Sequence, residues 1–438
     1  MIKNDYKDFA LVSTIPENWS IMPLKWFLVN HDGGAWGDEP TGEDGDRICI
    51  RIADFNYSKG TVKENTELTI RNYSQSVIDR LLLRKGDIIV EKSGGGDKTP
   101  VGRTIVFRQN YEALFANFSE RLRIRSEYNY EFVNYCLRAF YYIGGSYNYF
   151  NQTTGIQNLS IGKYLSDIYL PCPDTSFQDA IVSYLDAKCA AIDEAIERHK
   201  KIIDKLEEYK KTATIKAVTK GIRGNAIDDS GEEWLGSIPK HWSVKRNWAL
   251  FRETNERGND ALPILTVSIN SGISDRELSD NESERVFVRS EDRSKYKRVQ
   301  PGDIAYNMMR AWQGAFGAAR VEGMVSPAYI TARPIVKMDT RYFEYLMRTN
   351  IAAKEFEKYS RGITDFRLRL YYPEFRNIRV CVPPIEEQSE IADYLDVLYS
   401  KTEQAIKQNN AIVEKLEEYR KSIIYNAVTG KIDCRTVR

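Results

Sequence analysis

The chain of 438 residues is poor in the residues of metal and disulfide chemistry. It has three histidines and six cysteines, and the cysteines are scattered, without a Cys-x-x-Cys pair or a neighbouring histidine. Zinc sites and disulfide frameworks need closely spaced ligands or paired cysteines, so neither is predicted. His31, His199 and His241 lie far apart and have no nucleophile motif around them. We therefore predict no metal site and no catalytic residue.

The chain also lacks long apolar runs and an excess of one charge. Apolar residues make up 42%, charged residues 29%, and the net charge is +1. No run approaches the roughly 20 apolar residues of a membrane-spanning helix, and residues 1–10 lack the apolar core of a signal peptide. This predicts a cytoplasmic protein with no membrane partner. Net charge alone does not indicate nucleic-acid binding, so contact with DNA would need local patches or a basic partner.

Three patterns resemble enzyme motifs but lack a required feature. Residues 95–99 (GGDKT) have Asp97 where a phosphate loop needs glycine, and its charge would repel a phosphate, so we predict a surface turn. Asp186 and Lys188 resemble part of a nuclease signature, but they fall on different faces of a predicted helix. Residues 382–385 (VPPI) lack the polar and aromatic members of an amino-methyltransferase motif. The chain is therefore predicted to be non-catalytic.

One stretch of the chain occurs twice. Residues 184–186 (YLD) recur as 394–396, and residues 206–211 (LEEYKK) recur almost unchanged as 416–421 (LEEYRK), always 210 positions later. An offset that is constant over such a distance indicates two copies of one structural module.

Each copy carries a heptad pattern that is typical of a long amphipathic helix. Taking residues 176–219 as one helix gives a length of about 65 Å. Such a helix needs a partner, and its own copy is the obvious one, so we predict a coiled coil; the alternative is a helix lying on the core of its own domain. His199 and Asn409 fall at equivalent d positions, where they either form a polar rung or face solvent. The predicted helix–helix interface consists of Leu185, Ile192, Ile196, Ile203, Leu206, Leu395, Ile406, Val413 and Leu416.

The repeat extends beyond the helices into two further blocks. The openings at residues 15–19 (IPENW) and 238–242 (IPKHW) correspond, and a Gly-Asp-Ile turn at residues 86–88 recurs at 302–304. Short β-branched runs between Gly-rich turns predict strands, for example at 48–52 and 87–90. The fold class is therefore predicted to be α+β with two β-rich blocks.

Composition also suggests where the parts of the chain begin and end. Residues 221–236, rich in Gly, Asp, Asn and Ser, are predicted to link the two halves. The predicted order is a first β-rich block, a helix, a second β-rich block and a second helix, at residues 1–172, 173–222, 223–382 and 383–438.

The two blocks match at framework positions and differ in their loops. The loop at residues 91–103 corresponds to 307–314, and the segment 152–159 corresponds loosely to 361–368, with different side chains in each case. A duplicated scaffold with divergent loops suits a protein that reads two different ligands from one frame.

Taken together, the chain resembles the specificity (S) subunit of Type I restriction-modification systems. The resemblance covers nearly the whole chain. It rests on the Ile-Pro-x-x-Trp openings, the Gly-Asp-Ile turns, residues 314–329, and residues 383–388 (PPIEEQ) leading into 394–396. The first helix departs from the pattern, because residues 173–178 (PDTSFQ) lack the Glu-Gln pair. This departure leaves the N-terminal edge of that helix open.

The resemblance implies two pseudo-two-fold-related target-recognition domains, held apart by an antiparallel pair of long coiled-coil helices. Each domain would read one half of a split target in double-stranded DNA. The chain would be inactive alone: two modification subunits would supply S-adenosylmethionine-dependent adenine methylation, and two restriction subunits, in a system that restricts, would use ATP and Mg. No cofactor would be bound by this chain. The alternative is a coiled-coil protein scaffold that reads no DNA.

We expect the DNA contacts to come from loop residues of the two blocks. Arg and Lys suit phosphate and guanine, while Asn and Gln suit adenine. Trp36 and Trp312 either pack on DNA or seal a core. Two domains on a helical spacer predict half-sites about one helical turn apart or a little more. The candidate contacts are Lys92, Lys98, Arg103, Gln152 and Thr153 in the first block and Asn307, Arg310, Gln313, Arg361 and Arg367 in the second.

Overall fold

The protein forms two compact units that share two long helices. The first unit contains residues 1–200 and 410–438, and the second contains residues 201–409. The computed structural model describes residues 11, 15–64, 67–153, 155–259, 261–269, 271–278, 295–362 and 368–436. Arg367 lies outside the described residues.

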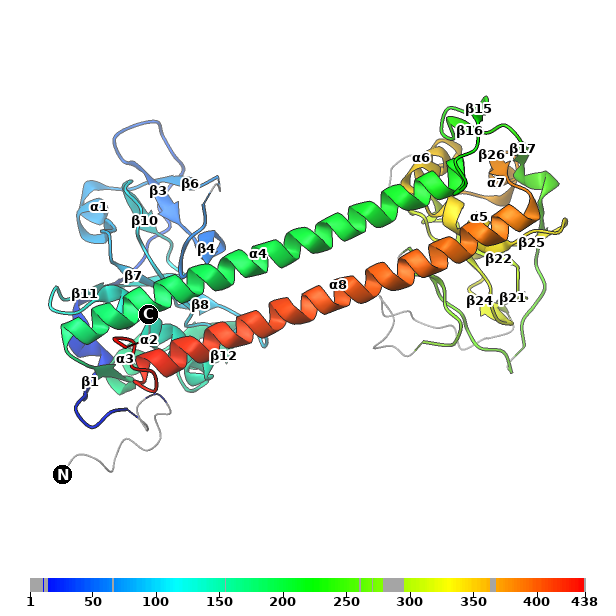
Figure 1. Cartoon of the computed structure of the whole chain (residues 1–438). Helices are drawn as coiled ribbons and strands as arrows, with labels where there is room; N and C mark the ends of the chain where they lie inside the picture. The colour runs from blue at the N-terminus through cyan, green and yellow to red at the C-terminus, as the bar shows by residue number, and fades with distance from the viewer. Residues whose placement is uncertain are drawn as a thin grey trace. The chain divides into compact units, whose positions relative to one another are not determined.

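The long helices are α4 (Thr175–Lys220) and α8 (Ile385–Val428). The helix predicted over 176–219 is thus confirmed to within one residue at each end. Each helix contributes one half to each unit, and within each unit the two halves run in opposite directions (Figure 1).

The described residues of the first unit form four sheets and three α-helices besides the long ones. Its largest sheet has the order β2 (Leu28–Gly33), β11 (Ser119–Ile124), β7 (Ile88–Glu91), β9 (Thr104–Val106), β5 (Thr61–Val62) and β4 (Phe55–Asn56). Two three-stranded sheets have the orders β10 (Ala113–Phe115), β3 (Asp46–Ile50), β6 (Thr69–Asn72) and β12 (Phe150–Thr153), β13 (Ile156–Leu159), β8 (Ser93–Gly94). β1 (Ser20–Pro23) pairs with β14 (Tyr169–Cys172). The helices are α1 (Gln75–Leu81), α2 (Tyr130–Tyr142) and α3 (Ile161–Asp167). Strands β3 and β7 confirm, within two residues, the two strands predicted from β-branched runs.

The second unit repeats part of this plan. Its central sheet has the order β18 (Phe251–Thr254), β25 (Tyr329–Pro334), β22 (Ile304–Asn307) and β23 (Phe316–Ala318). The paired strands are β17 (Ser243–Arg246) with β26 (Arg379–Val382), β19 (Val267–Ser268) with β20 (Gly272–Ile273), and β21 (Lys297–Val299) with β24 (Gly323–Val325). The helices are α5 (Thr340–Met347), α6 (Asn350–Tyr359) and α7 (Tyr372–Phe375).

The segment predicted as a linker is partly a strand. β15 (Ile227–Asp229) lies inside residues 221–236 and pairs with β16 (Ser237–Pro239), immediately before the second Pro-x-x-Trp turn. Two side-by-side main chains can pair whatever their side chains, so a polar composition did not reveal this strand.

Each unit has its own core, and the halves of the long helices take part in it. In the first unit, Ile192 and Ile196 are buried in a cluster against which Val413 and Leu416 pack. Leu185 belongs to the same cluster, and Leu395 belongs to the core of the second unit. The remaining predicted interface residues are half-buried: Ile203, Leu206 and Ile406.

A buried glutamine connects each long helix to its unit. The Gln178 side chain donates to the Pro173 carbonyl and accepts the N–H of Asn129, both at 2.9 Å. Gln388 makes the same two bonds, to the Pro383 carbonyl at 2.8 Å and from the Asp339 N–H at 3.0 Å. The side-chain amide thus joins the start of a long helix to the chain entering α2 or α5.

The N-terminal edge of the first long helix, which the sequence left open, is settled at Thr175. Of the Glu-Gln pair, the first copy keeps the glutamine and has another residue in place of the glutamate. Phe177 occupies that place, and its ring centroid lies 6.0 Å from that of Trp19. In the second copy Glu387 accepts the indole N–H of Trp242 at 3.0 Å. A polar contact of one repeat is therefore an aromatic contact in the other.

Candidate nucleic-acid interface

Both Gly-Asp-Ile turns are fixed by a buried aspartate. In the turn at residues 86–88 the carboxylate accepts two hydrogen bonds from Arg123, at 2.7 and 2.8 Å. In the turn at 302–304 it accepts two from Arg333, at 2.8 and 2.9 Å. The glycine of each turn has φ above +90°, a conformation that favours glycine. Both turns therefore start their strands, β7 and β22, in the same rigid way.

Each of these strands then enters a loop that is held beside a second segment. The Leu159 N–H donates to the Lys92 carbonyl at 2.8 Å, and the Leu370 N–H donates to the Met308 carbonyl at 2.9 Å. A main-chain bond of the same kind thus holds the loop after each strand beside the end of the second candidate segment, at its last residue in the first unit and two residues after it in the second. Their side chains differ, which is the arrangement expected of a common frame with different specificities.

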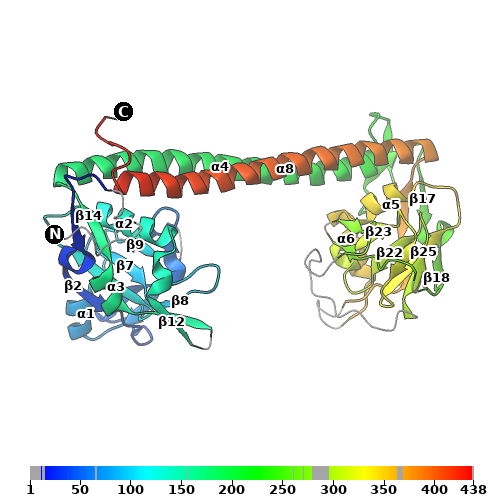
Figure 2. The same cartoon turned by 90° about the horizontal axis from the view of Figure 1, so that it is seen from below.

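In the first unit the sheet of β12, β13 and β8 brings three candidate contacts together. β13 pairs with both β12 and β8, so Gln152 and Thr153 share a sheet with the segment that follows Lys92. Gln152 is exposed, while the Lys92 ammonium lies 3.2 Å from Glu120. Figure 2 shows β8 and β12 on the side of this unit away from the long helices.

The loop after β8 carries the other two candidates of the first unit. Lys98 is exposed on a turn closed by two hydrogen bonds between Gly96 and Thr99, which confirms the predicted surface turn. Arg103 instead points inward: it donates to the buried Glu91 carboxylate at 2.7 and 2.9 Å. Burial raises the pKa of Glu91, and Arg103 opposes that shift. Arg103 therefore closes the base of the loop, and a DNA contact from it stays a prediction.

The four described candidates of the second unit differ in exposure. Asn307 is 8% exposed and accepts the Met309 N–H at 3.0 Å, so its side chain shapes the turn after β22. Arg310 is half-buried, whereas Gln313 is exposed. Arg361 is paired with Glu374 but leaves 75% of its side chain exposed.

The two candidate tryptophans lie outside the buried cores of their units. Trp36 is 40% exposed, and the guanidinium of Arg71 lies 4.3 Å from its ring centroid. Trp312 is half-buried and donates its indole N–H to the Met309 carbonyl at 3.1 Å. Core sealing is therefore not the role of either residue, and packing on DNA stays a prediction.

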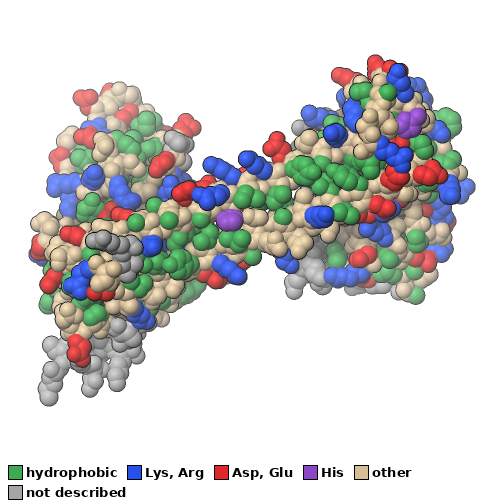
Figure 3. Space-filling view, viewed as in Figure 1, with side chains coloured by type: hydrophobic (Ala, Val, Ile, Leu, Met, Phe, Trp, Pro, Cys, Tyr) green, Lys and Arg blue, Asp and Glu red, His purple; other side chains and the backbone are tan. Residues whose placement is uncertain are grey.

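The charges of the molecule are finely mixed. On the face shown in Figure 3, basic and acidic side chains alternate over each unit, in keeping with the net charge of +1. Within the described ranges no group of three or more His, Cys, Asp or Glu side chains is placed to hold a metal ion. None of the described helices is long and apolar enough to cross a membrane.

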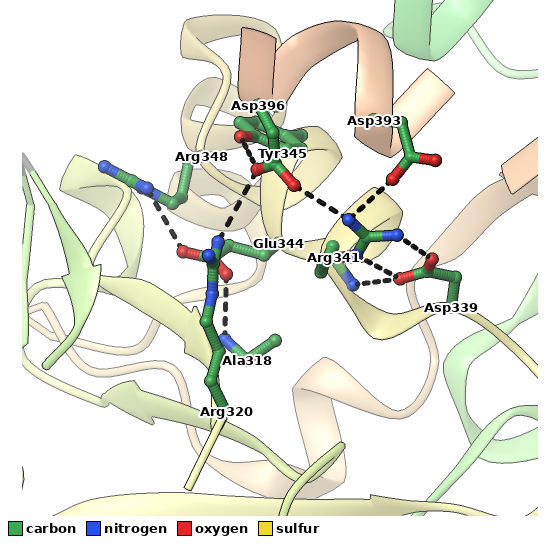
Figure 4. A network of polar contacts seen from close by, with 9 residues as sticks. All are labelled: Ala318, Arg320, Asp339, Arg341, Glu344, Tyr345, Arg348, Asp393 and Asp396. Atoms are coloured by element: carbon green, nitrogen blue, oxygen red, sulfur yellow. Dashed lines mark hydrogen bonds and ion pairs between the residues drawn. The ribbon is translucent and has the colours of Figure 1, made fainter. Parts of the chain in front are cut away.

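A polar network holds the β-rich part of the second unit on α8 (Figure 4). Arg341, at the start of α5, donates to Asp393 and Asp396 of α8, each at 2.8 Å. It also donates to Asp339 at 2.6 Å. The Tyr345 hydroxyl donates to Asp396 at 2.6 Å. Side chains of α5 and α8 thus join α5 to this part of the long helix.

The first unit contains the counterpart of this contact. The Tyr135 hydroxyl of α2 donates to Asp186 of α4 at 2.6 Å. Sequence reasoning missed both tyrosines as positioning residues. The signal was present, because the offset of 210 that relates Asp186 to Asp396 also relates Tyr135 to Tyr345.

Comparison with known proteins defines the class of this fold. A solved chain from a type I restriction-modification system superposes with a TM-score of 0.67 at 14% identity, over 95% of this chain and 99% of that one. The HsdS subunit of Thermoanaerobacter tengcongensis gives a TM-score of 0.52, also at 14% identity, over 95% and 98%. The fold is that of a Type I specificity subunit.

Sequence matches point to the same kind of protein. Residues 244–415 match the family model of the Type I restriction modification DNA specificity domain. The Escherichia coli Type I restriction enzyme EcoBI specificity subunit is 23% identical over 292 residues, 63% of this chain and 61% of that protein. The Methanocaldococcus jannaschii MjaVIII specificity subunit is 25% identical over 298 residues, 64% and 65% respectively. In sequence the chain is similar to Type I restriction-modification specificity subunits, and it spans less than two thirds of the length of these two relatives.

Proposed function

We propose that this chain is the non-catalytic subunit that reads a split DNA target, one half with the β-rich part of each unit. The observation that carries the proposal is the pair of equivalent main-chain bonds, Leu159 to Lys92 and Leu370 to Met308. They present two loops of different sequence from one frame. In the first unit Lys92, Lys98, Gln152 and Thr153 would contact DNA, with Arg103 supporting the loop.

In the second unit the exposed side chains of Arg361 and Gln313 would contact DNA, with Arg310 and Arg367. Asn307 would act by shaping its turn. Guanidinium groups and amides are the side chains suited to guanine, adenine and phosphate. Two modification subunits would supply the methylation chemistry with S-adenosylmethionine, and restriction subunits would use ATP and Mg. No cofactor would be held by this chain.

A domain exchange tests the proposal. Residues 1–172 end with β14, just before α4, so they can be replaced by the corresponding block of another family member. The modified motif in genomic DNA is then determined in cells with the matching modification subunits. We expect one half of the split motif to change and the other half to remain. A motif that changes in both halves, or in neither, would contradict the proposal.

Point variants sharpen this test. Gln152→Ala should relax specificity in one half-site and Gln313→Ala in the other, each by about 1–3 kcal/mol per lost base contact. Lys200→Ala, an exposed residue of α4, is the control and should leave both half-sites intact. If neither glutamine variant changes either half-site and duplex DNA binding is independent of salt, the scaffold alternative is favoured.

A spacer variant tests the role of the long helices. Inserting one heptad after Leu206 of α4, with a matching heptad in α8, should lengthen the gap between the half-sites without altering either sequence. An unchanged gap in an assembled complex would contradict the role of the helices as a spacer.

A further inference from the structure

The first unit contains a cavity that is lined by more basic than acidic side chains. Its volume is about 510 Å³, and it lies between α2, the loop after β8 and the last turns of α8. Such a volume is typical of small-ligand sites, which span about 300–1,000 Å³. Five basic side chains and one acidic side chain, Glu417, line it, together with four tyrosines.

Arg138 of α2 is the unusual member of this lining. It is 5% exposed, and it donates to the Ser58 carbonyl at 2.7 Å and to the Tyr142 hydroxyl at 3.2 Å. Among the described residues no carboxylate lies within ion-pair distance of it, and its Nε has no acceptor there. A buried cation without a counter-ion is costly, so this position favours an anion.

In the second repeat the equivalent arginine has a carboxylate partner, which Arg138 lacks within the described ranges. Arg348 lies 210 positions after Arg138, and Glu344 binds it at 3.2 Å (Figure 4). The residue 210 positions before Glu344 is Asn134, which is neutral and accepts the Thr104 hydroxyl at 2.8 Å. The first repeat therefore has the same arginine, here buried, and an amide in place of the carboxylate.

The other basic residues of the cavity are of two kinds. Arg103 and Arg420 are neutralised by carboxylates, Glu91 and Asp193 respectively. Lys98 and Lys421 are exposed and have no carboxylate within ion-pair distance in the described part of the chain. Set against Glu417, these two lysines and Arg138 leave about two positive charges for a ligand to neutralise.

The tyrosines determine which anion fits. Tyr57, Tyr141, Tyr142 and Tyr147 all line the cavity. Aromatic rings bind the flat face of a nucleobase by stacking, and a phosphate group carries one to two negative charges with several acceptor oxygens. Cations already lie near two of these rings: the Arg103 guanidinium is 3.7 Å from the Tyr57 ring centroid, and the Lys421 ammonium is 5.9 Å from that of Tyr142. An anion without a ring would leave the rings of Tyr141 and Tyr147 without a ligand contact.

We propose that this cavity binds the phosphate group of a nucleotide, with the base against the tyrosine rings. The same chemistry has two sources, a free nucleotide or one nucleotide of a DNA strand. Only the second source rests on the proposed function, because the first needs no recognition of DNA sequence.

The test introduces into the first repeat the carboxylate that the second repeat has at Glu344. In Asn134→Glu the new side chain supplies Arg138 with the partner that Arg348 already has. In Lys421→Glu an exposed side chain at the cavity is reversed in charge. Lys415→Glu makes the same change on an exposed residue of α8 outside the lining. The full chain is titrated with adenosine monophosphate, with inorganic phosphate and with duplex DNA, the last with and without its co-purified partners.

For a free nucleotide we expect adenosine monophosphate to bind more tightly than phosphate alone. Asn134→Glu and Lys421→Glu should each weaken this binding about tenfold or more, as loss of a charge-assisted contact does. Lys415→Glu should leave it unchanged. For a nucleotide of DNA we expect no mononucleotide binding and a weaker complex with duplex DNA in the same two variants.

The proposal is wrong if Lys421→Glu matches Lys415→Glu in every titration, even where Asn134→Glu does not fold. It is also wrong if a folded Asn134→Glu chain binds all three probes like the wild type. Neither result affects the proposed function, which the exchange of residues 1–172 tests separately.

Discussion

Replacing Arg341 by alanine should loosen the β-rich part of the second unit from α8. The guanidinium binds Asp339, Asp393 and Asp396 at 2.6–2.8 Å. Without it, three carboxylates that shared one cation face each other across the α5–α8 contact. Another basic group, Arg320, lies 3.6 Å from Asp396.

The exposure of these groups sets the expected magnitude. The side chain of Arg341 is 30% exposed, and those of Asp339 and Asp396 are 15% and 31% exposed. Breaking a fully buried ion pair costs about 3–5 kcal/mol, and breaking an exposed one costs about 0–1 kcal/mol. For this half-buried group we expect the free energy of unfolding of the second unit to fall by about 2 kcal/mol.

Urea unfolding of the full chain, followed by circular dichroism at low and high ionic strength, measures this loss. The control is Arg361→Ala. The Arg361 side chain is 75% exposed, although that of its partner Glu374 is 12% exposed, so this pair should contribute about 1 kcal/mol or less. The loss for Arg341→Ala should shrink at high salt, because ions screen the pairs that it removes. Equal losses in the two variants would refute the idea that this network anchors the unit.

Three further predictions concern buried groups. Asp87→Ala and Asp303→Ala should each cost about 3 kcal/mol in their own unit alone, so limited proteolysis should cut one unit first; cleavage of both units at once would contradict this. Burial raises the pKa of Glu344 above its usual 4.5, and Arg348 opposes the shift. The contribution of Glu344 to the free energy of unfolding is therefore fully present below its pKa in the unfolded state, and it is lost as pH rises through its pKa in the folded state. In Glu344→Gln the free energy of unfolding, measured with urea, should depend less on pH in this range. An unchanged pH profile would count against the assignment of this dependence to Glu344. Burial raises the pKa of Cys381 to about 12, so mass spectrometry should find it alkylated at neutral pH only after unfolding, and labelling of the native chain would be the opposite result.

The long helices could be predicted from the sequence because their signal is local and repeated. The heptad pattern placed α4 within a residue of its observed ends, and the offset of 210 gave its relation to α8. The Gly-Asp-Ile turns were predicted for a similar reason. Glycine at positive φ marks a turn whatever surrounds it.

The pairing of side chains across strands was harder to predict. Arg103 lies in a Gly-rich loop and was assigned to DNA, yet it binds Glu91, the last residue of β7. That contact depends on where the loop returns to the sheet, which composition does not specify. Asn307 was assigned in the same way, although it ends β22 and shapes the following turn.

The uneven pairing of Arg138 and Arg348 was also beyond the sequence alone. These two arginines are related by the same offset as the helices, but nothing in the sequence says that Arg138 is buried and that Arg348 is half-buried. The structure shows that α2 and α5 occupy equivalent places. The change from Glu344 to Asn134 then means that the arginine of the first repeat has lost its carboxylate partner, as far as the described residues go.

The glutamines that start the long helices limit which residues each site can accept. Gln178 and Gln388 each use a donor and an acceptor at once, so the side chain serves as a substitute peptide group. Glutamate at neutral pH would keep the acceptor and lose the donor, and asparagine would be one methylene short. In a library of all amino acids at these two positions, glutamine should therefore be selected at both, even though neither residue touches DNA in the proposed function. Intolerance to substitution at these sites would show that the start of each long helix must be joined to the chain entering α2 or α5.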